Sequence, residues 1–170
     1  MADKKALLKK AATVHWGTPR ELYRRLDRTF CFDFDPCPLG APGGSGTLDF
    51  DGLTARWGKR NFVNPPYGPA IPAWLKKGID EAQLGALSVF LLPARTDTRW
   101  FHDLVIPEAA EIGFLRGRLT FVGAPSPAPF PSMIVLFKPD RRAAHPDKEK
   151  DPIVVKSLHV PKAAAEETGS

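Results

Sequence analysis

The residues best suited to chemistry form one short stretch, Asn64-Pro65-Pro66-Tyr67. Each proline fixes its φ at about −65°, lacks an N–H and favours extended geometry in the residue before it. We therefore expect a stiff loop in which the Asn64 amide oxygen and the Pro65 carbonyl are free to accept hydrogen bonds. Two acceptors next to an aromatic face suit a planar amino group carried by a ring. The alternative is a proline turn in which Asn64 caps the chain and Tyr67 packs.

The element before this loop places it where ligands commonly bind. The apolar approach Asn61-Phe62-Val63 stops abruptly at Asn64, as a strand does at its carboxyl end, and a helix-like segment follows. In open α/β sheets, ligands bind beyond the carboxyl ends of the strands. The sequence therefore predicts that Asn64 faces a ligand pocket.

Two other predicted strand ends carry polar residues. Residues 32–35 are expected to form a short buried strand that ends at Asp35-Pro36, where a carboxylate suits a ligand's ammonium or hydroxyl groups. The alternative is a turn-forming aspartate before proline. Arg95 and Arg99 follow the continuous apolar run 87–92, where they would meet phosphate or form ion pairs with neighbouring acids.

Three amphipathic helices are expected between the strands. The first has Thr18 as N-cap, Pro19 at the first helical position and Glu21 completing a Thr-x-x-Glu capping box. Thr96 or Asp97 is expected to cap the third. Apolar residues at helical spacing mark the buried faces. They are Leu22, Leu26 and Phe30 in the first helix, Ile71, Trp74, Leu75, Ile79 and Ala82 in the second (with Lys76, Lys77 and Glu81 outside), and Trp100, Phe101, Leu104 and Val105 in the third.

The order of these elements indicates the fold class. Residues 111–121 and 133–137 are predicted to pair as an antiparallel hairpin, and 153–160 to add an edge strand. Alternation of strands and helices favours an α/β domain with a mostly parallel sheet and a C-terminal antiparallel hairpin. We divide the chain into a flexible basic N-terminus (1–13), one main domain (14–138) and a polar, partly disordered extension (139–170).

Composition bounds the kind of protein. A chain of 170 residues with 43% hydrophobic and 25% charged residues is typical of one globular domain. A formal charge of +5 and an isoelectric point of about 9.4 favour a polyanionic partner. No signal peptide and no apolar run of ~20 residues is found, so we expect a cytoplasmic protein without a membrane partner. Cys31 and Cys37 match neither a disulfide framework nor zinc spacing, so no metal is expected. No feature indicates a particular oligomeric state.

Taken together, these motifs resemble the phage-type DNA adenine-N6 methyltransferase family, a compact group within the S-adenosylmethionine-dependent methyltransferases. The resemblance covers residues 14–138 and rests on the ordered set rather than on any single motif. The motifs are Trp16-Gly17-Thr18-Pro19, Asp33-Phe34-Asp35-Pro36, Asp51-Gly52-Leu53, Asn64-Pro65-Pro66-Tyr67-Gly68, residues 91–102 and Phe130-Pro131-Ser132-Met133. The resemblance implies a compact Rossmann-like methyltransferase fold.

The resemblance also implies an activity. A methyl group would pass from S-adenosylmethionine to the N6 amino group of adenine in DNA, with the base flipped out of the duplex. The implied catalytic residues are Asn64, Pro65, Pro66 and Tyr67. The implied cofactor-binding residues are Thr18, Pro19, Asp35, Pro36, Cys37, Asp51, Leu53 and Asn64. The implied DNA-binding residues are Tyr67, Arg95, Arg99 and Phe130.

Within these sets, the resemblance gives some residues particular roles. Asp35 would meet the cofactor's ammonium group, Asp51 would accept from its adenine amino group, and Leu53 would lie beside that ring. Tyr67 would stack on the flipped base, and Phe130 would pack against it.

Three alternative functions remain open at this point. The same loop would methylate the N4 amine of cytosine or a protein glutamine amide, or the chain would be a nucleic-acid-binding module without catalysis. The net positive charge and the segment Arg95–Trp100 favour DNA over protein as the substrate. The sequence also departs from larger methyltransferases. It lacks their full Gly-x-Gly loop after Asp35, and it has no room for a separate target-recognition domain.

Overall fold

The computed structural model describes residues 16–38, 51–139 and 153–159. The predicted basic segment 1–13, and the parts of the 139–170 extension at 140–152 and 160–170, lie outside these ranges. The elements in chain order are α2 (Arg20–Phe30), β1 (Arg60–Val63), α3 (Ile71–Gln83), β2 (Leu87–Pro93), a π-helix η2 (Phe101–Val105), α4 (Ile106–Glu108), β3 (Glu111–Leu115), β4 (Ser132–Phe137) and β5 (Val154–Leu158).

The strands form one open sheet in the order β1-β2-β4-β3-β5. β1 pairs with β2 and β3 with β5 in parallel, whereas β4 runs antiparallel to both β2 and β3. The α/β class, the antiparallel pair and the edge strand within 153–160 are confirmed. The sheet is mixed rather than mostly parallel, because β4 inserts between two parallel pairs. The strand predicted at 32–35 is reduced to one parallel bridge between Phe34 and Asn61.

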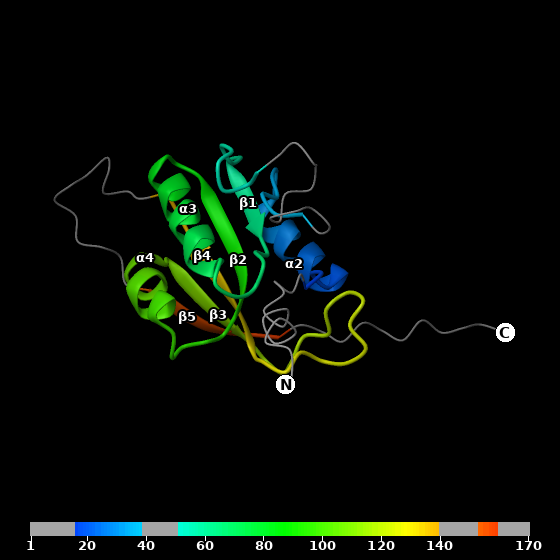
Figure 1. Ribbon diagram of the computed structural model, residues 1–170. Helices are drawn as coiled ribbons and strands as arrows, with labels where there is room; N and C mark the ends of the chain where they lie inside the picture. The colour runs from blue at the N-terminus through cyan, green and yellow to red at the C-terminus, as the bar shows by residue number, and fades with distance from the viewer. Residues whose placement is uncertain (1–15, 39–50, 140–152, 160–170) are drawn as a thin grey trace, which may run out of the picture.

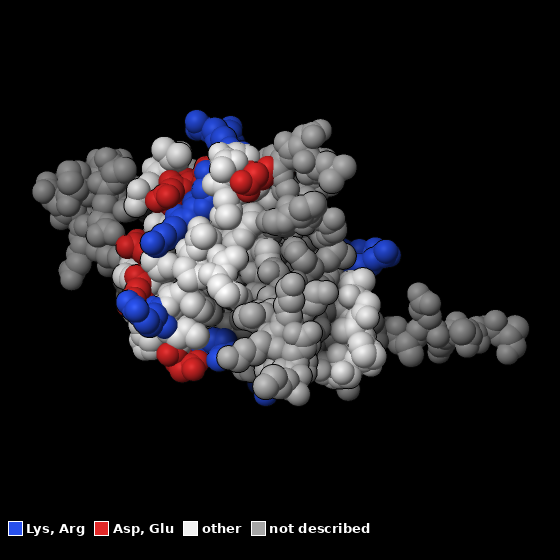
Figure 2. All heavy atoms as spheres, in the orientation of Figure 1, with Lys and Arg blue, Asp and Glu red and all other residues white. Residues whose placement is uncertain are grey.

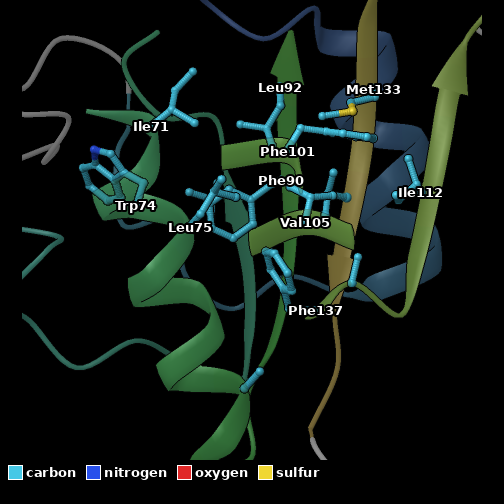
Figure 3. Close-up of a cluster of buried hydrophobic side chains, with 14 of the residues drawn as sticks. Ile71, Trp74, Leu75, Phe90, Leu92, Phe101, Val105, Ile112, Met133 and Phe137 are labelled. Carbon is cyan, nitrogen blue, oxygen red and sulfur yellow. The ribbon is translucent and has the colours of Figure 1, made fainter. Parts of the chain in front are cut away.

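Side chains along the interior strands β2 and β4 alternate between two apolar layers, as the two-residue period of a strand requires. Figure 1 shows α3 and α4 together on one side of the sheet and α2 apart from them, beside β1. The layer drawn in Figure 3 joins sheet residues to α3 and the π-helix, through Trp74, Leu75, Phe90, Leu92, Phe101, Val105, Met133 and Phe137. The second layer joins the sheet to α2, through Leu22, Leu26, Phe62, Val89, Leu91, Ile134 and Leu136.

The predicted helices form, but their ends and one of their faces differ from expectation. α2 begins at Arg20 with Pro19 at the N-cap position and no side-chain cap, so the capping box of Thr18 and Glu21 was wrong. No side chain caps the π-helix either, and neither Thr96 nor Asp97 has the predicted role. The apolar face of α3 is as predicted.

Glu81 on α3 is the exception to the predicted outer face. It is only 3% exposed, because its carboxylate accepts hydrogen bonds from Lys77 Nζ (2.6 Å) and from the Trp57 backbone N–H (3.4 Å). A buried charge is tolerated when it is paired in this way. Its burial shows that α3 has polar as well as apolar contacts with the loop before β1.

The carboxyl ends of β1 and β2 and the start of β4 meet at one edge of the sheet. β1 ends immediately before Asn64, and Pro93 at the end of β2 is in register with Ser132 of β4. Just beyond, the Ala94 N–H donates to the Pro131 carbonyl at 2.8 Å. The loops that carry Asn64, Arg95 and Phe130 therefore leave the sheet at the edge that the sequence predicted.

Two features are absent from the described residues. No helix there has the length and apolar character needed to cross a membrane. The same ranges hold no group of three or more His, Cys, Asp or Glu side chains arranged to bind a metal ion.

Gly78 gives a test of the packing between α3 and the sheet. A Cβ at this position would lie 2.5 Å from Phe90 Cε2, and the Phe90 ring is fully buried. We expect Gly78→Ala to destabilise the protein by about 1–2 kcal/mol, because overpacking outweighs the gain in helix propensity. Urea unfolding measures this, with Lys76→Ala on the exposed face of α3 as control. Equal or greater stability of Gly78→Ala would contradict the packing.

Candidate active site

A cavity of about 270 Å³ lies on the α2 side of the sheet, beside the end of β1. Its walls come from four stretches that are distant in sequence: the segment running into α2 together with α2 itself, the turn after Phe34, the end of β1, and Val122 in the loop after β3. Four of the predicted site residues line it together, namely Thr18, Asp35, Cys37 and Asn64. The fold thus gathers part of the expected site around one space.

The orientation of the Asn64 side chain is set by its neighbours. Its Nδ2 donates to the Trp16 carbonyl and, at 3.0 Å, to Thr18 Oγ1. A carbonyl oxygen only accepts, so the amide nitrogen must face Trp16 and the amide oxygen must point away. The backbone N–H of Asn64 lies beside the Cys37 thiol, where it offsets part of the rise in the thiol pKa that burial causes. Asn64 therefore contacts both the segment before α2 and the turn after Phe34.

This arrangement leaves the Asn64 oxygen without a partner. Among the described residues, Asn64 Oδ1 is buried and accepts no hydrogen bond. Asn61 Oδ1 and Ser132 Oγ are also buried without a hydrogen bond from the described residues, but neither residue lines the cavity. Within the same ranges no hydrogen bond reaches the Pro65 carbonyl. A buried acceptor without a donor costs roughly 1–3 kcal/mol, so a ligand donor here would be strongly favoured.

Tyr67 follows the two prolines and is anchored at its tip. Its hydroxyl donates to the Leu91 carbonyl of β2 at 3.2 Å. Burial, followed by the neighbouring Cys37, raises the pKa of Tyr67 above its usual value, so the phenol stays protonated. The ring is therefore fixed in place, and its packing against both core layers is also what the packing alternative predicts.

Tyr67 belongs to an aromatic cluster with Trp16, Phe121 and Phe130. The Tyr67 and Phe130 centroids are 5.7 Å apart, and Trp16 contacts Phe130 at 5.7 Å and Phe121 at 5.1 Å. These tilted and edge-on geometries are favourable for aromatic pairs. Because Trp16 also holds Asn64 through its carbonyl, the cluster adjoins the unpaired oxygen.

Asp35 forms the acidic wall of the cavity. Its Oδ1 accepts from the Cys37 N–H at 2.9 Å, in the turn that aspartate favours. Burial raises the pKa of Asp35 to about 6, and the Cys37 hydrogen bond offsets only part of this. Among the described residues, no Lys, Arg or His side chain forms an ion pair with this carboxylate. A ligand cation is the partner that would stabilise this carboxylate.

Four predicted cofactor residues lie outside the cavity lining: Pro19, Pro36, Asp51 and Leu53. The 51–53 turn nonetheless contacts Pro36, since a Cβ on Gly52 would lie 2.0 Å from the Pro36 carbonyl oxygen. Asp51 Oδ1 accepts from the Leu53 N–H at 2.9 Å, and Leu53 packs against the core. The turn is therefore next to the Asp35 segment without entering the cavity.

Arg95 and Arg99 lie at the surface beyond β2. Their guanidinium groups approach Asp97 at 3.6 Å and Asp103 at 3.9 Å, and all four side chains are largely exposed. Exposed pairs of this kind contribute little stability, so the arginines remain open to phosphate. Figure 2 shows Lys and Arg interspersed with Asp and Glu on the visible face, not gathered into one basic patch.

The cavity also contains residues that the sequence did not single out as binding residues. Tyr23, whose hydroxyl pKa is raised by burial and then by Asp27 and Asp35, lines it together with Phe62 and Val122. Arg20 and Arg24 line it from α2. The sequence held one signal for these two binding residues, namely two arginines four residues apart directly after a Thr-Pro motif.

Comparison with known proteins agrees with this geometry. The family model described as DNA N-6-adenine-methyltransferase (Dam) matches residues 5–160. A DNA N-6-adenine-methyltransferase of Haemophilus phage HP1 (strain HP1c1) is 28% identical over 147 residues, which cover 79% of this chain and 84% of that protein. The chain belongs to the Dam family of DNA N-6-adenine-methyltransferases. It is an adenine-specific DNA methyltransferase.

Asp35→Asn tests whether the acidic wall is built for a ligand at the expense of stability. The folded protein keeps a proton between the ordinary pKa of 3.8 and the raised pKa of about 6, so its stability falls as pH rises through that window. We expect the variant, which keeps the Cys37 bond, to be more stable than the wild type above pH 6, by up to about 3 kcal/mol. This difference in stability between the variant and the wild type should vanish below pH 4.

Urea unfolding at several pH values measures this effect. Asp97→Asn is the matched control, because the Asp97 side chain is 75% exposed and its replacement should leave stability nearly unchanged. A variant less stable than the wild type at neutral pH would show that Asp35 has a structural partner.

Proposed function

We propose that this chain transfers a methyl group from S-adenosylmethionine to the N6 amino group of adenine in DNA, with the base flipped out of the duplex beside Asn64-Pro65-Pro66-Tyr67. One observation carries the proposal: Asn64 has both amide hydrogens bonded within the protein, while its buried oxygen accepts no hydrogen bond from the described residues. That oxygen requires a donor, and an exocyclic amine supplies one.

The chemistry follows from the weak nucleophilicity of the adenine amine. Its nitrogen lone pair is delocalised into the ring. If Asn64 Oδ1 and the Pro65 carbonyl each accept one amino hydrogen, the nitrogen pyramidalises and the lone pair leaves the ring plane. The two acceptors act by orientation and electrostatic preorganisation. No strong base is needed first, because the nitrogen becomes acidic only once it carries the new methyl group.

The cavity fits the amino-acid end of S-adenosylmethionine, which supplies an electrophilic methyl group when bound. Asp35, a buried carboxylate with a raised pKa, would hold the ammonium. Thr18 and Cys37 would form the adjoining wall, with Pro19 and Pro36 supporting it. The 51–53 turn, in contact with Pro36, would hold the adenine end through Asp51 and Leu53.

DNA would bind at the same edge of the sheet. Tyr67 offers a fixed ring for stacking, and Phe130 lies against it in the aromatic cluster. Extruding a base costs roughly a few kcal/mol. Phosphate contacts from Arg95 and Arg99 would offset this cost, and the affinity for DNA would then fall as salt rises.

Asn64→Ala tests the catalytic assignment. The variant should bind S-adenosylmethionine with nearly wild-type affinity and lose about 10²–10³ in methyl transfer, as expected when a preorganised acceptor is removed. Transfer is measured with radiolabelled cofactor and mixed-sequence DNA. Digestion to nucleosides and mass spectrometry then identify the methylated base.

Two outcomes would count against the proposal. Near wild-type labelling of DNA by Asn64→Ala would remove Asn64 from the reaction. A wild-type product other than N6-methyladenine, such as N4-methylcytosine, would overturn the stated substrate.

Thr18 gives a second test through the orientation of Asn64. Thr18→Val removes the hydroxyl that accepts from Asn64 Nδ2 and allows the amide to rotate. We expect a loss of about tenfold in methyl transfer, since a hydrogen bond of this kind is worth about 0.5–1.5 kcal/mol. Thr18→Ser keeps the hydroxyl and should retain most of the activity. Equal activity of the two variants would show that the Thr18 bond does not position Asn64.

A further inference from the structure

Arg20 and Arg24 form a basic wall of the same cavity, opposite in charge to Asp35. Both project from α2, and both line the cavity together with Asp35 and Asn64. Residues four apart lie on the same face of a helix, one turn from each other. The cavity therefore presents two guanidinium groups and one carboxylate to a single ligand space.

These two arginines differ from the other arginines of α2. Arg28 approaches Glu21 at 4.0 Å, and Arg25 donates to the His159 carbonyl beyond β5. Within the described ranges, the side chains of Arg20 and Arg24 form no ion pair and no hydrogen bond. Neither pairs with Asp35, whose carboxylate accepts a hydrogen bond from the Cys37 N–H but forms no ion pair with a described residue. The cavity lining thus holds three charged side chains that form no ion pair among the described residues.

The start of α2 adds to this positive wall. The first N–H groups of a helix lack partners in the helix and carry partial positive charge. Among the described residues no side chain caps α2, and the Thr18 hydroxyl accepts a hydrogen bond from Asn64. The unpaired Asn64 oxygen in the same cavity is independent support for a ligand at this place.

We propose that Arg20 and Arg24 bind the carboxylate of the cofactor's amino-acid end while Asp35 binds its ammonium. This inference rests on the proposed use of S-adenosylmethionine. An α-amino acid carries both charges close together, so it matches a cavity lined by both acidic and basic groups. Guanidinium groups suit this role because they donate to carboxylates in bidentate geometry.

The proposal assigns the arginines to the cofactor rather than to DNA phosphate. A phosphate of the DNA backbone would satisfy the same guanidinium groups, but it would leave Asp35 facing an anion. Burial already raises the pKa of Asp35, and a second negative charge nearby would destabilise its carboxylate further. A zwitterion avoids this repulsion.

The experiment measures ligand binding by calorimetry without DNA. The ligands are S-adenosylmethionine, its decarboxylated form, which keeps the ammonium, and 5′-methylthioadenosine, which lacks both charged groups. The proteins are the wild type, Arg20→Gln, Arg24→Gln, Asp35→Asn and the control Arg28→Gln. Arg28 lies on the same helix outside the cavity lining, with its side chain 73% exposed.

We expect each cavity arginine variant to bind S-adenosylmethionine about tenfold more weakly than the wild type, the effect of losing one charge-assisted hydrogen bond. The same variants should bind the decarboxylated ligand as the wild type does. Asp35→Asn should weaken both ammonium ligands, and Arg28→Gln should weaken none. Binding of 5′-methylthioadenosine should be the same for all five proteins.

Other results would overturn the inference. One is an unchanged affinity of both arginine variants for S-adenosylmethionine. The other is an equal loss of affinity for S-adenosylmethionine and for its decarboxylated form. Weakened binding of a fluorescent DNA duplex with intact cofactor binding would assign the arginines to phosphate. A wild-type protein that binds no S-adenosylmethionine would overturn the proposed cofactor and this inference with it, whereas normal wild-type binding with unaffected variants would overturn the inference alone.

Discussion

The site depends on the two hydrogen bonds that the Asn64 amide donates to Trp16 and Thr18. They use both amide hydrogens inside the protein and leave the oxygen as the free group. One residue at the end of β1 thus holds the segment before α2, and its backbone N–H lies beside the Cys37 thiol of the turn after Phe34. From this segment, Trp16 contributes its ring to the aromatic cluster. Mutations at Trp16 or Thr18 are therefore expected to disturb the orientation of the Asn64 amide.

The sequence predicted those parts of the molecule that local rules determine. Proline geometry and an abrupt end to an apolar run located Asn64, and a continuous apolar run located β2. The ends of the strands then located Asp35, because parallel strands bring their carboxyl ends to one edge. These features need only the nearest neighbours in the chain or a general property of sheets.

The features that escaped prediction depend on contacts between distant residues. Thr18 has the right residue type for a helix cap, but Asn64, 46 positions away, competes for its hydroxyl. Glu81 looked like a surface residue until the Trp57 backbone supplied a buried donor. Arg20 and Arg24 are ordinary helix residues in sequence, and only the packing of α2 beside β1 places them in the lining of the same cavity as Asp35. Their partners are set by the tertiary fold, which no local pattern encodes.

The pairing of Gly17 with Val122 bears on how the site opens. This single bridge, with its 2.8 Å hydrogen bond, holds the Trp16–Thr18 segment to the loop after β3, and Val122 is 54% exposed. A short segment held by few backbone bonds detaches at a lower free energy than the whole domain needs to unfold. Its detachment would release the Asn64 amide and open one wall of the cavity while the sheet stayed folded. Protection of the Val122 amide from hydrogen exchange would then report the integrity of the site, separately from that of the core.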